Sequence, residues 1–108
     1  MHQINIKPLS VNKAWRGKLS KTPTLMKYNR DIGLILPRIK VPEGFLRLSI
    51  EFGFSSKASD IDNPLKPFID CLQNKYGFDD KNIYELAIKK EVVKRGNEYI
   101  KFNLESIS

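Results

Sequence analysis

The sequence has little of several features that would restrict its function. Its 108 residues include one cysteine, one histidine and one tryptophan. The single cysteine, Cys71, excludes an internal disulfide and a cysteine-rich metal site, and it fits a reducing, cytoplasmic setting. No apolar run approaches the roughly 18 residues that span a bilayer, and the N-terminus lacks the apolar core of a signal peptide. We therefore expect a cytoplasmic protein with no membrane partner, folded as one domain over residues 1–108.

Charge is distributed unevenly along the chain. The net charge is +7, but residues 1–58 carry a balance of +8 and residues 59–108 carry −1. A basic half predicts a polyanionic partner. Acids that gather between positions 60 and 80 in such a protein make sense if they hold a cation against a phosphate. The alternative is chance clustering on a solvated surface.

Four segments alternate between apolar and polar residues and predict strands: residues 3–6, 45–54, 83–93 and 99–104. The turn at residues 95–98 predicts that the last strand runs back antiparallel to the strand of residues 83–93, as in a hairpin. The connection before the first helix, residues 9–22, is polar and basic and predicts a loop.

Two segments with apolar residues at helical spacing predict helices. The first follows Thr22-Pro23, with Thr22 as the N-cap. The second follows Asn63-Pro64, with Asn63 as the N-cap and Gly77 as the C-terminal stop. The order β-α-β-α-β-β predicts a two-layer α+β domain, with a mixed four-stranded sheet and two helices on one face.

The acids around the second helix form two pairs. Asp60 and Asp62 lie two apart in an extended segment before the helix N-terminus, a position that favours anions. Asp79 and Asp80 follow the C-terminus, where acids oppose the helix dipole and local stability explains them poorly. If the strand from Ile83 runs beside the 45–54 strand, we expect Asp80 to fold back towards Asp60 and Asp62.

Three converging carboxylates suit Mg²⁺, which prefers hard oxygen ligands and retains several waters. Such an ion can polarise a phosphate and activate a water. Lys66 could neutralise charge in the transition state, although the residues alone favour a solvated helix lysine. Asp70, four residues later, could orient Lys66 or simply pair with it. The residues favour a metal-dependent phosphodiesterase over a plain binding module, although Asp-x-Asp alone is a weak motif.

The block from Asp60 to Leu72, followed by Asp79-Asp80 and Ile83, resembles the RusA family of crossover-junction endodeoxyribonucleases. The family pattern is D-x-D-N-x-x-K-x-x-x-D-x-L with a D-D pair after the helix. A long strand with Lys90, a Gly-containing hairpin and a final short strand look similar too, and Ser10-Val11-Asn12 matches the S-x-N element after the family's first strand. The arginine-rich run that family members often have before D-x-D is represented here by Lys57 alone.

The resemblance implies a RusA-like fold, a homodimer and Mg²⁺-dependent cleavage, with Mn²⁺ as a substitute. The expected substrate is a four-way (Holliday) DNA junction, nicked symmetrically in DNA recombination and repair, with no small-molecule substrate. The metal ligands would be Asp60, Asp62 and Asp80, and the essential lysine Lys66. Acidic family positions of a secondary kind fall on Asp70 and Asp79. Small members are often encoded in phages or prophages, which implies a bacterial or phage-infected cell.

Basic residues of the N-terminal half are the candidates for phosphate contacts. They are Lys13, Arg16, Lys18, Lys21 and Lys57. Asn12 is a secondary candidate, and Trp15 could stack on a base, although a lone tryptophan is more often buried. Two other functions remain open: a catalytically idle nucleic-acid-binding protein of the same fold, and a nuclease that acts on flap or RNA substrates.

Overall fold

In the computed structural model, which describes residues 1–10, 15–16 and 20–107, a mixed sheet has the strand order β1-β6-β4-β5. Its strands are β1 (His2–Ile4), β4 (Leu46–Phe54), β5 (Ile83–Val92) and β6 (Tyr99–Ser106). β4 pairs parallel with β5 and antiparallel with β6, and β6 pairs antiparallel with β1. A separate small ladder joins β2 (Trp15–Arg16) to β3 (Ser20–Lys21). The predicted α+β architecture, with a four-stranded mixed sheet, is confirmed.

The alternation in β4 builds the core. Its even-numbered residues are buried on one face, from Leu46 through Leu48, Ile50 and Phe52 to Phe54. The buried side chains of β6 lie beside them, since Ile50 pairs with Phe102. The parallel pairing then gives β5 the same two faces, and Leu86, Ile88, Lys90 and Val92 share the core side with the even residues of β4.

The expected return of the last strand needs a correction. β6 runs antiparallel, but its partners in the sheet are β4 and β1 rather than β5. The reason is burial: Ile100, Phe102 and Leu104 are all buried, which a position between β4 and β1 allows. β5 carries exposed residues along much of its length and lies at the edge. β1 also ends at Ile4 rather than residue 6, because its partner strand begins at Tyr99, just before Ile100, the partner of Ile4.

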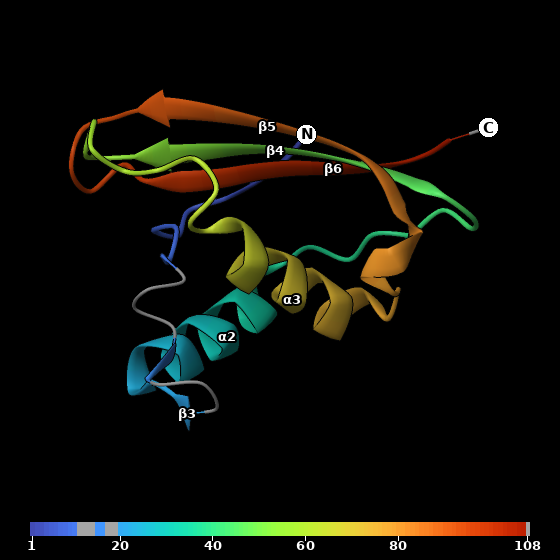
Figure 1. Ribbon diagram of the computed structural model, residues 1–108, viewed down its shortest axis with the longest axis horizontal. Coiled ribbons are helices and arrows are strands. Elements are labelled where there is room, and N and C mark those ends of the chain that lie inside the picture. Colours follow the sequence, from blue (N-terminus) through green and yellow to red (C-terminus); the bar gives the residue numbers. More distant parts are fainter. Residues whose placement is uncertain (11–14, 17–19, 108) are drawn as a thin grey trace.

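Helices α2 (Pro23–Ile35) and α3 (Leu65–Tyr76) lie on the same side of the sheet (Figure 1). Thr22 caps α2 as predicted, since its Oγ1 accepts a hydrogen bond from Leu25 N at 3.1 Å. α2 buries Leu25, Tyr28 and Ile32 against the core. Within the described residues, neither helix is long and apolar enough to cross a bilayer.

The second helix begins differently from the prediction. Pro64 holds the N-cap position, and no side chain caps α3. Asn63 lies one residue before this N-cap, and its side-chain amide donates to Asp60 Oδ2 at 3.2 Å. The C-terminal prediction is confirmed: Gly77 has φ of 76° and donates its N–H to Gln73 O. The predicted apolar stripe packs on the sheet through Phe68 and Leu72.

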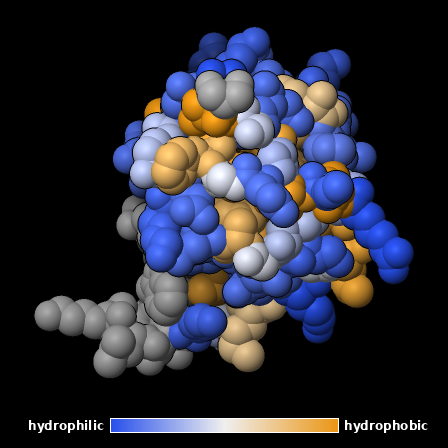
Figure 2. All heavy atoms as spheres, turned by 90° about the vertical axis from the view of Figure 1, so that its right-hand side faces the viewer, coloured by the Kyte–Doolittle hydropathy of each residue, from blue (hydrophilic) through white to orange (hydrophobic). Residues whose placement is uncertain are grey.

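Most of the surface at the end of the molecule where β5 begins is hydrophilic (Figure 2). Apolar side chains form small separate patches on this face, as is usual for a protein surface.

Candidate functional site

The segment of residues 55–63, here called the Asp60 loop, connects the end of β4 to α3. Lys90, a residue of β5, anchors this loop: its Nζ donates to Lys57 O at 2.9 Å and also to Ser59 O. The same ammonium lies 5.8 Å from the centre of the Phe54 ring. The sequence did not assign this role to Lys90. The available signal was a lysine at a core-facing position of a strand, between Ile88 and Val92.

The carboxylates of the loop face solvent. Asp60 and Asp62 are both exposed, and Asp60 accepts the hydrogen bond from Asn63. The carbonyl of Asp62 accepts from Leu65 N at 3.1 Å, so the chain turns into α3 directly after the acids. The free amides and positive end of the helix dipole favour negative charge at this position.

The second acidic pair lies at the other end of α3. Asp80 begins a 3₁₀ turn, η1 (Asp80–Asn82), that leads into β5. Because β5 runs parallel to β4, its first residue Ile83 pairs with Leu46, and its last residue Val92 pairs with Phe54. Asp80 therefore lies where the parallel strands begin, and the Asp60 loop lies where they end (Figure 1). A strand of this length separates the two ends by about 25 Å.

The expectation that Asp80 folds back to Asp60 and Asp62 within one chain is thus not met. The strand from Ile83 does lie beside β4, but a parallel crossover brings it back to the start of β4, not to its end. Among the described residues, no group of three or more Asp, Glu, His or Cys side chains could hold a metal ion.

Lys66 and the remaining acids have local partners. Lys66 Nζ donates to Asp70 Oδ1 at 2.7 Å, one helical turn away. This hydrogen bond raises the pKa of Lys66, and the charges of Asp70 and Asp80 act in the same direction, while partial burial acts against them. Asp79 caps η1, since its side chain accepts from Lys81 N. The secondary acids are therefore explained by an ion pair and a cap.

The loop carboxylates suit a divalent cation in part. Mg²⁺ is commonly bound through one or two carboxylates, with substrate phosphates and waters as its other ligands. Asp60 and Asp62 supply two such oxygen donors, exposed to solvent and next to a helix N-terminus. In the part of the chain that the structure describes, no third Asp, Glu, His or Cys side chain joins them.

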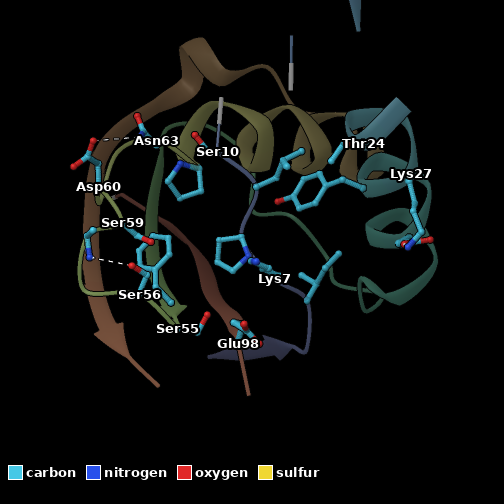
Figure 3. A pocket seen from close by; sticks show the side chains of 18 residues that line it. Lys7, Ser10, Thr24, Lys27, Ser55, Ser56, Ser59, Asp60, Asn63 and Glu98 are labelled. Atoms are coloured by element: carbon cyan, nitrogen blue, oxygen red, sulfur yellow. Dashed lines mark hydrogen bonds and ion pairs between the residues drawn. The ribbon is translucent and has the colours of Figure 1, made fainter. Parts of the chain in front are cut away.

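A cavity of about 570 Å³ lies beside the Asp60 loop (Figure 3). The chain after β1, the first half of α2 and the loop itself form its walls, and Asp60 and Asn63 lie at its rim. Tyr28 contributes to the wall, and its hydroxyl is buried without a hydrogen-bond partner in the described structure. Lys7 and Lys27 lie at the same opening together with Asp31 and Glu98, and Lys27 pairs with Asp31 at 3.2 Å.

The predicted phosphate contacts are only partly visible. Lys21 and Lys57 are exposed, and Lys57 belongs to the Asp60 loop. Arg16 and Trp15 are described only as the backbone of β2. Lys13, Lys18 and Asn12 lie outside the described residues.

Comparison with known proteins adds no relative: no family model matches this chain, and no curated protein matches it. The fold class is a two-layer α+β domain with a mixed sheet. A function therefore has to be argued from the chemistry of the site.

Proposed function

We propose that this protein is a Mg²⁺-dependent endonuclease that acts on DNA, with Asp60 and Asp62 as its cation ligands. The observation that carries the proposal is the construction of the Asp60 loop. It presents two exposed carboxylates next to the positive end of α3, and Lys90 anchors the loop through two backbone carbonyls.

A bound Mg²⁺ would supply a Lewis acid for the phosphate and lower the pKa of a coordinated water. The chain's own residues would hold and orient the reactants. Asn63 keeps one oxygen of Asp60 occupied, which leaves the other oxygen free for the cation. Lys66 pairs with Asp70 in this structure and lies four residues after Asp62 in the chain. Its side chain would turn to a phosphate bound at the loop and offset the negative charge of that phosphate. In the reaction, a water oxygen would bond to phosphorus as the bond between phosphorus and one sugar oxygen breaks, and a proton from the water would pass to that leaving oxygen.

The substrate class follows from charge and resemblance together. The net charge of +7 attracts a polyanion, and its excess lies in the first half of the chain. The D-x-D-N-x-x-K-x-x-x-D-x-L pattern resembles the RusA family, so we propose four-way DNA junctions as the preferred substrate. We also propose a homodimer, because symmetric nicks in two strands need two sites at a fixed separation.

Substitution of Asp62 tests this function. Asp62→Asn should lower the Mg²⁺-dependent nicking rate by more than about 100-fold, since changes outside the first coordination shell alone cost roughly 10- to 100-fold. Junction binding should persist or tighten, because a negative charge near phosphate is removed. Glu43→Gln, which removes an exposed charge far from the loop in sequence, is the control and should cut normally.

The assay should compare junction, flap, duplex and RNA substrates side by side. Preferential nicking of junctions supports the proposal. Preferential cleavage of flaps or RNA would show that the site acts on that substrate instead of on junctions. Wild-type nicking by Asp62→Asn would remove Asp62 from the chemistry.

One observation favours a second function, an idle nucleic-acid-binding protein of the same fold. Within one chain, Asp80 lies at the opposite end of the sheet from Asp60 and Asp62. An idle protein would bind DNA with an affinity that falls steeply with salt and would give no Mg²⁺-dependent product on any substrate.

A further inference from the structure

The cavity beside the Asp60 loop has no part in the reaction proposed above. Its volume of about 570 Å³ lies within the range of small-molecule sites, roughly 300–1,000 Å³. The Asp60 loop forms one of its walls, and Figure 3 shows Asp60 and Asn63 on one side of the opening with Lys27 on the other. A ligand in this cavity would therefore lie directly beside a candidate cation ligand.

The lining of the cavity combines apolar surface with uncharged hydrogen-bonding groups. Rings supply much of the apolar part, among them Tyr28, Phe54 and Pro64. Hydroxyls supply the polar part, among them those of Ser55 and Ser59. Tyr28 is 6% exposed, and its hydroxyl has no hydrogen-bond partner among the described residues, a local cost typical of functional sites. Sites for small organic ligands have this composition, mostly apolar with a few polar groups.

The charges of the wall decide which part of a nucleotide fits inside. Among the lining residues that the structure describes, two are cationic, Lys7 and Lys27. Three are anionic: Asp31, Asp60 and Glu98. The ammonium of Lys27 is offset by Asp31, whose carboxylate lies 3.2 Å away. The cavity therefore has no excess of positive charge to hold a phosphate, and it suits an uncharged, planar group with polar edges.

We propose that the cavity binds one unstacked base of the DNA strand, with the phosphate of the same nucleotide at the Asp60 loop. One sugar separates a base from its phosphate, so a base inside the cavity leaves the phosphate at the rim, beside Asp60. Unstacking costs least where a base is already unpaired, so the cavity favours strands with unpaired bases over intact duplex. The assignment of the base to a DNA strand rests on the proposed nuclease function; the affinity of the cavity for a base does not.

Free deoxynucleosides test the cavity without a cation and without cleavage. The amide signals of Leu9, Ser55 and Ser59, which line the cavity, should shift in NMR spectra as a deoxynucleoside is added. The expected dissociation constant is on the order of 1 mM for at least one of the four common bases. Deoxyribose, the sugar without a base, is the control ligand and should give no shift. The absence of a shift with all four deoxynucleosides would overturn the proposal.

Bulky substitutions at two walls should block the site. Ala58 and Thr24 are exposed and line the cavity from the Asp60 loop and from α2. Ala58→Phe and Thr24→Trp should each weaken nucleoside binding by about tenfold or more, a loss of the size of one stacking contact. Because the two residues belong to different elements, misfolding of one variant does not decide the result.

Each blocking variant has a matched control at a residue outside the cavity. Ser106→Phe changes an exposed residue at the end of β6, and Met26→Trp changes a residue of α2 that is 61% exposed. Both controls should bind nucleosides as the wild type does. Wild-type binding by Ala58→Phe and Thr24→Trp would overturn the proposal.

Deoxynucleoside monophosphates join the cavity to the cation site. With Mg²⁺ present, a monophosphate should bind more tightly than its nucleoside, because its phosphate then contacts the cation at the Asp60 loop. Asp62→Asn should abolish this gain. If nucleosides bind in the cavity but Mg²⁺ adds nothing, the cation site fails while this inference stands. If Mg²⁺ tightens monophosphate binding and the blocking variants bind like the wild type, the cation site stands and this inference fails.

Discussion

At the scale of single residues, Tyr28 is the least satisfied group in the described core. Its hydroxyl is buried and has no hydrogen-bond partner among the described residues, and burial raises the pKa of the phenol far above its ordinary value. A buried polar group without a partner costs about 1–3 kcal/mol. Tyr28 also lines the cavity beside the Asp60 loop. The unfavourable free energy of its unpaired hydroxyl therefore arises next to the candidate site, and such local costs are typical of functional sites.

Removal of that hydroxyl should stabilise the protein. We expect Tyr28→Phe to raise the free energy of unfolding by about 1 kcal/mol, since the ring keeps its packing and the unpaired group is lost. Tyr76→Phe should do the opposite, because Tyr76 donates to Pro37 O at 2.6 Å. Urea titration of both variants measures the difference. A loss of stability in Tyr28→Phe would mean that its hydroxyl has a partner in solution.

At the scale of elements, the Asp60 loop depends on β5. The loop lies between β4 and α3 in sequence, but its anchor, Lys90, comes from the next strand. The contact with the Phe54 ring and the two carbonyls holds the ammonium in one place. The position of the candidate ligands is therefore set by the crossover from β4 through α3 to β5.

Loss of the anchor should loosen the loop and leave the fold intact. Lys90→Met keeps the length of the side chain and removes the donor, so amide exchange in residues 55–60 should become faster. The nicking rate of Lys90→Met should also fall below that of the wild type, since catalysis depends on a fixed geometry. Lys94→Met, at an exposed lysine just beyond the strand, is the control. Unchanged exchange in Lys90→Met would show that the loop holds itself.

At the scale of the whole molecule, several groups resist ionisation at high pH. Burial raises the pKa of Cys71 and of Tyr99 to about 12, and for Tyr99 the nearby Glu51 adds to the effect. A raised folded-state pKa contributes stability in full below the unfolded-state pKa. That stability is lost as the pH rises through the folded-state value.

The protein should therefore lose stability on the alkaline side. The contribution of these groups to the free energy of unfolding should be constant below about pH 8 and decrease towards pH 12. Tyr99→Phe should flatten part of the decrease, whereas Tyr84→Phe, at a residue 63% exposed, should not. Urea titration at a series of pH values measures the slope. An equal slope in wild type and Tyr99→Phe would contradict the assignment.

Local sequence patterns determined much of this molecule. Thr22-Pro23 begins α2, Gly77 ends α3, and the alternation of β4 and β5 gives two strands of the sheet. These features follow from the chain within a few residues of each position, such as capping, a left-handed turn and the period of a strand. The position of Asp60 and Asp62 just before the second helix was likewise predicted from the chain nearby.

Only the tertiary structure decided where the acids lie relative to one another. The sequence supported the idea that Asp80 meets Asp60 and Asp62, because a strand from Ile83 beside the 45–54 strand was expected to bring Asp80 back towards them. Parallel pairing of β4 and β5 places them at opposite ends of the sheet. Burial likewise decided the place of the last strand. β6 lies between β1 and β4, where its apolar side chains are buried, and not beside β5, which precedes it in the sequence. Spacing along the chain fixes which elements form, whereas the competition of strands for buried positions fixes which ends of them meet.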